Sequence, residues 1–390
     1  MKDRIIELTE KLEKELVEVN EKIYENPELG HQEHKSAKLH IDLLKKYGFQ
    51  VEESYMDIET GFRAEYDSKK EGPRVAFLIE YDALPGIGHG CGHNILGAVS
   101  SGASIVLKQV IDEIGGKVVA FGTPAEETNG TKVVFVDKGA FDDVDFAMIA
   151  HPNFTYNRSG KSLALEALEF EFTGKTSHAA AAPEKGINAL DAAINTFNSI
   201  NALRQQTRSD ARIHGIIPQG GEAANIIPER AVAQFYVRAQ TKSYLDGLVE
   251  RVKNCAKGAA LGAGAELKIS NYELSYHNLV TNHTMDNLFV EKIIELGIPK
   301  EEIKDPREGN GSSDAGNVSH VCPTIHPYFD ITNDENIAPH TREFASCTLT
   351  EYAYKNMKIT IEALVLTSVE IIKDRKLMKK IKKEFEKAEK

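Results

Sequence analysis

The sequence predicts an α/β fold, in which a larger domain with a mainly parallel sheet carries a smaller inserted domain of ferredoxin-like order. Three observations predict it. Short, continuously apolar runs typical of buried strands alternate with longer helical patterns. Near residue 163 these runs give way to segments in which apolar and polar residues alternate. The first pattern then returns near residue 278 and continues to the end of the chain.

The first part of the chain supplies the alternating helices and strands of the larger domain. In order, the expected elements are helices at about 2–26 and 31–47, a strand at 74–80, a helix at about 94–113, and strands at 117–123 and 145–150. Each of these strands ends in a loop rich in Asp, Glu, His, Gly or Pro. Because open α/β sheets bind ligands at the carboxyl ends of their strands, we expect the functional residues in these loops.

The middle of the chain follows the order strand, helix, strand, strand, helix, strand, which is the ferredoxin-like order. These elements are expected at 163–174, 186–207, 212–218, 231–239, 243–262 and 265–276. Residues 163–277 are therefore predicted to form a domain inserted between 1–162 and 278–390. After the insert we expect a helix at 283–297, a strand at 323–329 and a long helix from about 348.

The composition excludes several classes of protein. The 390 residues are 41% hydrophobic and 27% charged, which is enough to build a sizeable core. The formal net charge of −12 repels phosphate backbones, so a broad nucleic-acid surface is not expected. Four cysteines without CxxC pairing argue against a disulfide framework. We find no signal-peptide pattern and no run of about 18 apolar residues, so we expect a cytoplasmic protein without a membrane span.

The densest group of chemically reactive residues is YDALPGIGHGCGHN at 81–94, between a predicted buried strand and an apolar helix. Cys91 and His93 are two positions apart, and the surrounding glycines let the backbone turn tightly enough to aim both side chains at one point. Thiolate and imidazole are good zinc ligands. Taken alone, the pair is weak evidence, because a Gly-rich turn with an incidental cysteine explains it equally well.

Further candidate ligands follow the next two predicted strands. Glu126 and Glu127 are adjacent and so point in different directions, which suits one metal ligand and one general base. His151 closes the following strand, and His340 lies in a loop before the last helix. Each has an ordinary structural explanation when taken singly. Together, one thiolate, two carboxylates and three imidazoles converge at neighbouring strand ends if His340 folds back, which is enough for two metal ions.

The order of motifs along the chain resembles that of the co-catalytic metallopeptidases of clan MH. The matching motifs are D-A-L-P, H-G-C-G-H-N, P-A-E-E, H-P, S-H-A-A-A-A-P and a late P-H-T, and they cover nearly the whole chain. They are most similar to the amidohydrolase branch of aminoacylases, auxin-conjugate hydrolases and p-aminobenzoyl-glutamate hydrolase. The CGHN form and the stretch GSSDAGN at 311–317 favour the p-aminobenzoyl-glutamate hydrolase and β-alanyl-lysine dipeptidase side.

The resemblance implies a metal-dependent amidohydrolase that cleaves N-acyl amino acids, aryl-glutamate conjugates or dipeptides. It implies two metal ions, with Glu126 as the general base and Asp82 orienting a ligand imidazole. The five implied metal ligands are Cys91, which would bridge the ions, His93, Glu127, His151 and His340. His89 belongs to the motif but is not assigned as a ligand.

The sequence departs from the peptidase branches of the clan at two positions. Those branches have an aspartate as the bridging ligand, and a histidine two residues before the orienting aspartate. Cys91 and Glu80 stand at these positions here. The departure leaves zinc and manganese as alternative metals.

The resemblance also implies how substrate is held. His178 would reach into the active site of a partner subunit and stabilise the oxyanion, so a homodimer through the insert is expected. Substrate contacts are expected from Asn225, Arg238, Ser312 and Ser313. Strand alternation places Arg238 on the face opposite Phe235 and Val237, where a guanidinium could clamp a substrate carboxylate. A surface ion pair is the ordinary alternative for this arginine.

Two other functional classes stay open at this point. A non-catalytic binding or structural dimer on the same fold would be expected to lack the general base, yet Glu126 is present. A cysteine-nucleophile amidase would use Cys91 and His93 but has no need of the two adjacent glutamates. Removal of metal by a chelator separates this last class from a metal-dependent hydrolase.

Overall fold

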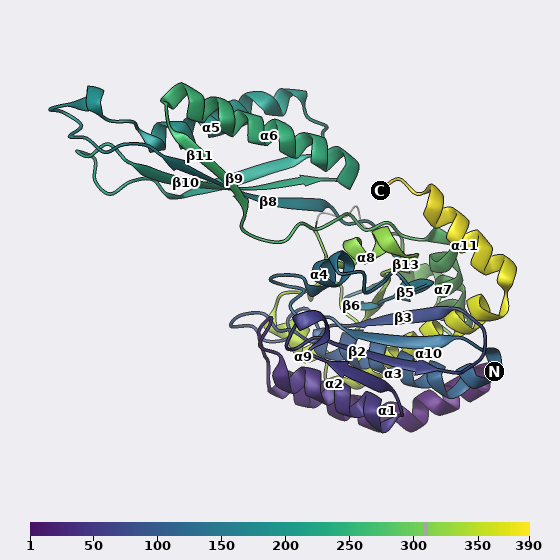
Figure 1. The fold of residues 1–390 in the computed structure, drawn as a ribbon. Coiled ribbons are helices and arrows are strands. Elements are labelled where there is room, and N and C mark those ends of the chain that lie inside the picture. Colours follow the sequence, from purple (N-terminus) through teal and green to yellow (C-terminus); the bar gives the residue numbers. More distant parts are fainter. Residues whose placement is uncertain (307–310) are drawn as a thin grey trace. The chain divides into compact units, whose positions relative to one another are not determined.

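The computed structural model describes residues 1–306 and 311–390, and the chain divides into two compact units, each visible in Figure 1. The larger unit contains Met1–Lys161 and most of residues 279–389, and the inserted unit contains Ser162–Asn278 with Gly311 and Ser312. The limits of the insert lie one residue from the predicted 163–277. The predicted fold class, an α/β unit with a mainly parallel sheet and a ferredoxin-like insert, is confirmed.

The larger unit is built on a six-stranded sheet in the order β1-β2-β4-β3-β5-β13. These strands are β1 (Gln50–Glu53), β2 (Phe62–Asp67), β3 (Arg74–Ile79), β4 (Lys117–Gly122), β5 (Phe146–Met148) and β13 (Thr324–Ile325). The last four are parallel, and β2 and β1 add to the β4 edge in antiparallel orientation. The prediction that β3, β4 and β5 are neighbours is confirmed. The sequence analysis missed β1 and β2, because their half-exposed residues form no continuous apolar run.

Helices cover both faces of this sheet (Figure 1). One face carries α1 (Lys2–Glu25), α2 (His34–Lys46), α3 (His93–Ile114) and α10 (Glu351–Lys373), and the other carries α4 (Thr131–Asp137) and α8 (Ala315–Val321). Successive residues of β3 enter the two cores in turn: Val75, Phe77 and Ile79 on the first face, Ala76 and Leu78 on the second. The remaining helices are α7 (His283–Glu295), α9 (Arg342–Cys347) and α11 (Arg375–Lys387). Burial on both faces explains why this strand is continuously apolar.

The helix α3 occupies the centre of the first core. In the described part of the chain it is the one helix that is long and apolar enough to cross a membrane, judged by length and composition alone. However, 89% of its most apolar window is buried inside the unit, against β3, β4, α1 and α10. A helix that is apolar all round and enclosed in this way is a core helix.

Two predicted elements near the C-terminus differ from their predicted bounds in the structure. The strand expected at 323–329 is two strands, because Pro327 has no N–H to donate and the chain changes sheet there. Its second part, β14 (Tyr328–Asp330), joins a small sheet with β6 (His151–Asn153), β7 (Tyr156–Asn157) and β12 (Ile303–Lys304). The helix expected from about 348 begins only at α10, where the Thr350 side chain caps the first turn.

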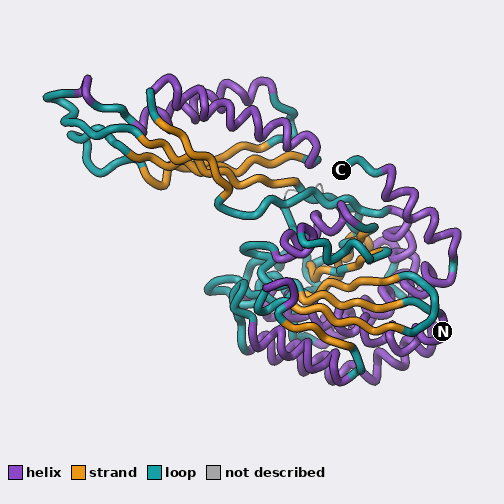
Figure 2. Tube along the Cα trace, viewed as in Figure 1, coloured by secondary structure: helices purple, strands orange, loops and turns teal. Residues whose placement is uncertain are grey.

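The inserted unit is a four-stranded antiparallel sheet with two helices on one face (Figure 2). Its elements are β8 (Ala164–Thr173), α5 (Ala189–Leu203), β9 (Arg212–Gln219), β10 (Arg230–Ala239), α6 (Lys242–Ala263) and β11 (Glu266–Asn271). The strand order β11-β8-β10-β9 is ferredoxin-like, as predicted. On β10, Phe235 and Val237 are buried under the helices, while Tyr236 and Arg238 are half-buried on the other face.

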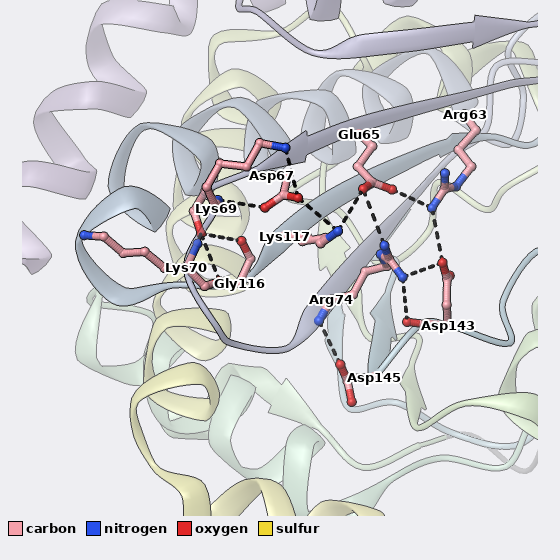
Figure 3. A network of polar contacts seen from close by, with 11 residues as sticks. Arg63, Glu65, Asp67, Lys69, Lys70, Arg74, Gly116, Lys117, Asp143 and Asp145 are labelled. Carbon is pink, nitrogen blue, oxygen red and sulfur yellow. Dashed lines mark hydrogen bonds and ion pairs between the residues drawn. The ribbon is translucent and has the colours of Figure 1, made fainter.

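Ion pairs connect the strands at the edge of the six-stranded sheet where β3 and β4 begin (Figure 3). Glu65 on β2 lies 3.4 Å from the guanidinium of Arg74 and 3.6 Å from the ammonium of Lys117. Asp67 lies 3.0 Å from Lys117. Partly exposed pairs of this kind stabilise a fold only slightly. They lie at the amino ends of the parallel strands, whereas the functional residues were predicted in the loops at the carboxyl ends.

A buried hydrogen-bond network holds the C-terminal segment against the N-terminal helices. The Asn20 side chain donates to the Thr348 carbonyl, and the Asn94 side chain donates to both Asn20 Oδ1 and Thr348 Oγ1, each at 2.9 Å. All three residues are fully buried. The network joins α1, the start of α3 and the connection from α9 to α10, so the last part of the chain is fixed beside the motif at 81–94.

We predict that Asn20→Ala lowers the free energy of unfolding by about 1–3 kcal/mol, because buried partners at Asn94 and Thr348 lose their hydrogen bonds. Guanidinium denaturation followed by circular dichroism measures the change. Asn254→Ala, at an exposed position of α6, is the control, and it should change stability by no more than about 0.5 kcal/mol. Equal stability of the two variants would contradict a structural role for this network.

Candidate metal centre

The predicted ligands gather at the carboxyl ends of β3, β4 and β5. Asp82 follows β3 closely, Cys91 and His93 stand at the start of α3, Glu127 follows β4, and His151 opens β6 directly after β5. Since parallel neighbouring strands end at the same edge of a sheet, these side chains lie together.

The centre of the group is His93, which is fully buried. Its Nδ1 donates a hydrogen bond of 2.8 Å to Asp82 Oδ1, and the second oxygen of Asp82 accepts from the Glu127 backbone N–H at 3.0 Å. Burial disfavours the charged carboxylate, but His93 and these hydrogen bonds outweigh it and hold the pKa of Asp82 below its ordinary value. Asp82 therefore fixes the ring with Nε2 directed into the cluster, as carboxylates do for metal-binding histidines.

The free nitrogen of His93 faces donors of three chemical kinds. Its Nε2 lies 3.3 Å from a carboxylate oxygen of Glu80 and 3.9 Å from one of Glu127. The donor atoms of Cys91, His93 and Glu127 all lie within 4.8 Å of one another, and so do those of Glu80, His93 and His151. His93 Nε2 is buried and has no hydrogen-bond partner among the described residues. Imidazole, thiolate and carboxylate donors around one unpartnered nitrogen fit a divalent transition metal.

His340 does fold back to this cluster. Its backbone N–H donates to the Gly90 carbonyl at 2.8 Å, and its ring Nε2 lies 4.0 Å from a Glu127 carboxylate oxygen. The residue has a left-handed backbone conformation with φ of 67°, and its side chain is 62% exposed. The turn before α3 requires glycine at position 92, because Gly92 has φ of 75° and a Cβ there would lie 2.6 Å from Pro152.

Glu126 lies beside the cluster and is half-buried. Burial, together with the nearby carboxylates of Glu80 and Glu127, raises its pKa well above the ordinary value. The preceding Ala125 has a left-handed φ of 62°, and its N–H donates to the buried Glu33 carboxylate at 2.8 Å. The turn that carries both glutamates is thus held in a strained conformation, which is common where side chains must be aimed.

The structure also shows charged residues that the sequence analysis did not assign. Lys132 is fully buried, and its ammonium lies 2.7 Å from both Glu80 and Asp314. Glu80 had been noted only as a departure from the peptidase pattern, and Asp314 only as part of the GSSDAGN stretch. The sequence carries no signal for Lys132, because a lysine at the start of a short helix is usually solvated.

The remaining predicted residues lie mostly in the inserted unit. His178 is exposed, its Nδ1 accepts from the N–H groups of Ala180 and Ala181, and the Ala179 N–H donates to the Asn225 carbonyl at 3.0 Å. Arg238 donates to Ser312 Oγ at 3.3 Å. These contacts bring His178 next to Asn225, and Arg238 next to Ser312.

Ser313 belongs to the larger unit, where its hydroxyl accepts from the Ala315 N–H at the start of α8. It thus contacts the helix start that follows Asp314.

Comparison with known proteins identifies the family. Residues 164–263 match the model of the peptidase dimerisation domain. The chain is 34% identical to the mouse Xaa-Arg dipeptidase, over 99% of this chain and 92% of that protein. The chain belongs to the M20 peptidase family. It is also 30% identical to one subunit of the Escherichia coli p-aminobenzoyl-glutamate hydrolase, over 73% of this chain and 63% of that protein.

A solved structure of this M20 family has the same fold. A dinuclear metal-binding peptidase from Bacillus subtilis superimposes with a TM-score of 0.70, covering 93% of this chain and 99% of that one at 23% identity. Membership of the family makes this M20 protein a hydrolase that acts on amide bonds, so the predicted family and enzyme class are confirmed. The candidate metal centre lies in the larger unit, outside the matched dimerisation domain.

We predict that Asp82→Asn weakens metal binding by about 10- to 100-fold, because the side-chain amide has one acceptor oxygen and cannot hold both the His93 ring and the Glu127 N–H as the carboxylate does. Competition of the metal-free protein with a chromophoric chelator measures the affinity. Asp286→Asn is the matched control, since Asp286 is also buried and accepts hydrogen bonds from Arg158 and Ser159 instead. Equal metal affinities of the two variants would rule out the orienting role.

Proposed function

We propose that this protein is a hydrolase with two divalent metal ions, zinc or manganese, that cleaves the amide bond of small substrates, dipeptides first among them. One observation carries the proposal. The buried His93, oriented by Asp82, directs an unpartnered Nε2 into a group of thiolate, imidazole and carboxylate donors. The proposed ligands are Cys91, His93, Glu127, His151 and His340.

Bound metal ions would supply Lewis acidity and lower the pKa of a coordinated water towards neutrality. Glu126, whose pKa is raised by burial and by the carboxylates of Glu80 and Glu127, takes a proton from the attacking water and returns it to the leaving amine. Asp82 keeps His93 in the tautomer that leaves Nε2 free. His178 donates a hydrogen bond to the developing oxyanion.

The substrate class is supported by the relatives. The mouse relative is named an Xaa-Arg dipeptidase, and the Escherichia coli relative acts on p-aminobenzoyl-glutamate. Both substrates present a free carboxylate next to the amide that is cleaved. Arg238 is suited to bind such a carboxylate. Its Nε is buried without a hydrogen-bond partner in the described residues, and its guanidinium group donates to the Ser312 hydroxyl. Asn225 and Ser313 are proposed to hold the rest of the substrate.

The homodimer and the cytoplasmic location remain predictions. The matched dimerisation domain at 164–263 supports pairing of two chains through the insert. The acidic net charge of −12 continues to argue against a nucleic-acid partner.

The cysteine-nucleophile alternative is disfavoured by the surroundings of Cys91. Burial and the carboxylates of Glu127, Glu126 and Asp82 raise the pKa of the Cys91 thiol far above its ordinary value. A nucleophilic cysteine needs the opposite, a pKa lowered by positive neighbours. A divalent cation would reverse this electrostatic penalty, so the same surroundings suit a metal-binding thiolate.

The function is tested by incubating the purified protein with zinc or manganese and a panel of substrates. The panel contains dipeptides ending in arginine or lysine, dipeptides with neutral termini, p-aminobenzoyl-glutamate and N-acyl amino acids. We expect turnover of at least one class, its loss after chelation, and its recovery when metal is restored. Turnover that survives complete metal removal would instead support the thiol mechanism.

We predict that Glu126→Gln lowers kcat by roughly 100- to 10,000-fold while metal content stays close to that of the wild type, because only the proton carrier is lost. Glu127→Gln should lower metal content more than Glu126→Gln does. Elemental analysis and kinetics of both variants provide the measurement. If the two metal contents rank the other way, the roles of the adjacent glutamates are exchanged.

We predict that His178 acts on the active site of the partner subunit. His178→Ala should lower kcat by about 100-fold or more with unchanged metal content, since an oxyanion donor is lost. Mixing this variant with Glu126→Gln under subunit exchange should restore partial activity, because one site of each heterodimer would hold both intact residues. Absence of recovery despite demonstrated exchange would place His178 in its own subunit's chemistry or outside catalysis.

A further inference from the structure

Glu80 is a buried carboxylate with one oxygen engaged and one directed at the cluster. It is 1% exposed and follows β3 directly, two residues before Asp82. One oxygen lies 2.7 Å from the Lys132 ammonium. The other lies 3.3 Å from His93 Nε2 and has no hydrogen-bond partner among the described residues. Glu80 and His93 thus place two buried atoms that can bind metal 3.3 Å apart.

Lys132 is itself fixed from the other side by Asp314. The Lys132 ammonium and backbone N–H contact the two oxygens of the Asp314 carboxylate, at 2.7 Å and 3.0 Å. Gly130 makes room for this contact, because a Cβ there would lie 2.5 Å from the Asp314 side chain. Lys132, Glu80 and Asp314 carry one positive and two negative charges when ionised. One buried negative charge is left over beside His93, and either a protonated His93 or a bound metal ion would neutralise it.

We propose that Glu80 is an additional protein ligand of the metal centre, holding one ion together with His93 and His151, and that Lys132 and Asp314 position it. This assignment rests on the proposed function, because it places a sixth donor in the two-ion centre. The donor atoms of Glu80, His93 and His151 all lie within 4.8 Å of one another.

The distances fit coordination of a single ion. Zinc binds nitrogen and oxygen donors at about 2.0–2.1 Å in tetrahedral geometry, which places two such donors about 3.3–3.4 Å apart. The Glu80 to His93 separation of 3.3 Å matches this value. His151 supplies the third metal-binding atom. Its Nδ1 donates a hydrogen bond to the Pro152 carbonyl at 2.7 Å, which leaves Nε2 as the ligand atom.

The assignment divides the centre into two chemically different sites. His93 has a single free nitrogen, so it ligates one ion only. Glu80, His93 and His151 would hold one ion. Cys91, which the family resemblance implied as a bridge, would then bind only the other ion, together with Glu127 and His340, where His340 Nε2 lies 4.0 Å from a Glu127 carboxylate oxygen. The Glu80 site has oxygen and nitrogen donors and accepts manganese as well as zinc, whereas the thiolate of the Cys91 site favours zinc.

Cobalt substitution of the Glu80→Gln protein tests this assignment. A cobalt ion bound to a thiolate gives a sulfur-to-metal charge-transfer absorption, so the Cys91 site reports separately from the Glu80 site. We expect wild-type protein to take up two cobalt equivalents and Glu80→Gln to take up one, with the charge-transfer band retained. The variant is suited to the test because the Lys132–Asp314 pair remains as a balanced ion pair.

The control is Glu362→Gln, which neutralises another buried carboxylate, on α10, and should still bind two equivalents. Two equivalents of unchanged affinity in Glu80→Gln would overturn the assignment and leave the proposed function standing. Loss of the charge-transfer band in that variant would overturn it too, because Glu80 would then serve the Cys91 site. A wild-type protein that takes up no cobalt would overturn the proposed function as well.

The positioning role of Lys132 has its own test. Replacing Lys132 with Met and Asp314 with Asn together removes one charge of each sign and leaves Glu80 in place. We expect this double variant to bind two cobalt equivalents, with the affinity of one ion lowered by about 10-fold or more. Unchanged affinity of both ions, measured by calorimetric titration, would show that Glu80 needs no positioning by this pair.

Discussion

The hydrogen bond between Asp82 and His93 is the contact on which the candidate centre depends. It connects the end of β3 to the first residue of α3, and through the second oxygen of Asp82 it also holds the Glu127 backbone after β4. Three separate chain segments are thus fixed by a single buried carboxylate. The Asp82 backbone carbonyl also lies 3.2 Å from His93 Nδ1, so both groups of Asp82 direct Nε2 towards the other donors.

The surroundings of this contact hold more negative than positive charge. The buried Lys132 pairs with Glu80 and Asp314, and burial together with the nearby carboxylates of Glu80, Glu127 and Asp314 raises the pKa of Glu126. Such an arrangement is costly for a protein without a bound cation and favourable with one. The electrostatics that disfavour a thiolate at Cys91 are therefore the same electrostatics that would attract divalent metal.

Much of the architecture and most of the cluster could be predicted from local sequence. The apolar runs of β3, β4 and β5 and the polar loops after them predicted neighbouring strand ends correctly. Strands β1 and β2 were missed, since their pattern depends on which face a neighbour covers. The division of residues 323–329 into two strands was missed as well, because a change of sheet at Pro327 is decided by distant strands.

The sequence alone determined the α/β class, the ferredoxin-like order of the insert and the residue types able to bind metal, because periodicity and motif spacing are local properties. Tertiary structure decided which donors face one another. In the sequence, Lys132 resembles a surface lysine and Glu80 resembles a replaced ligand. In the structure, α4 packs against α8 and brings Asp314 into contact with Lys132. Burial and distance between segments more than 180 residues apart set these roles, and neither quantity is encoded in any short stretch of the chain.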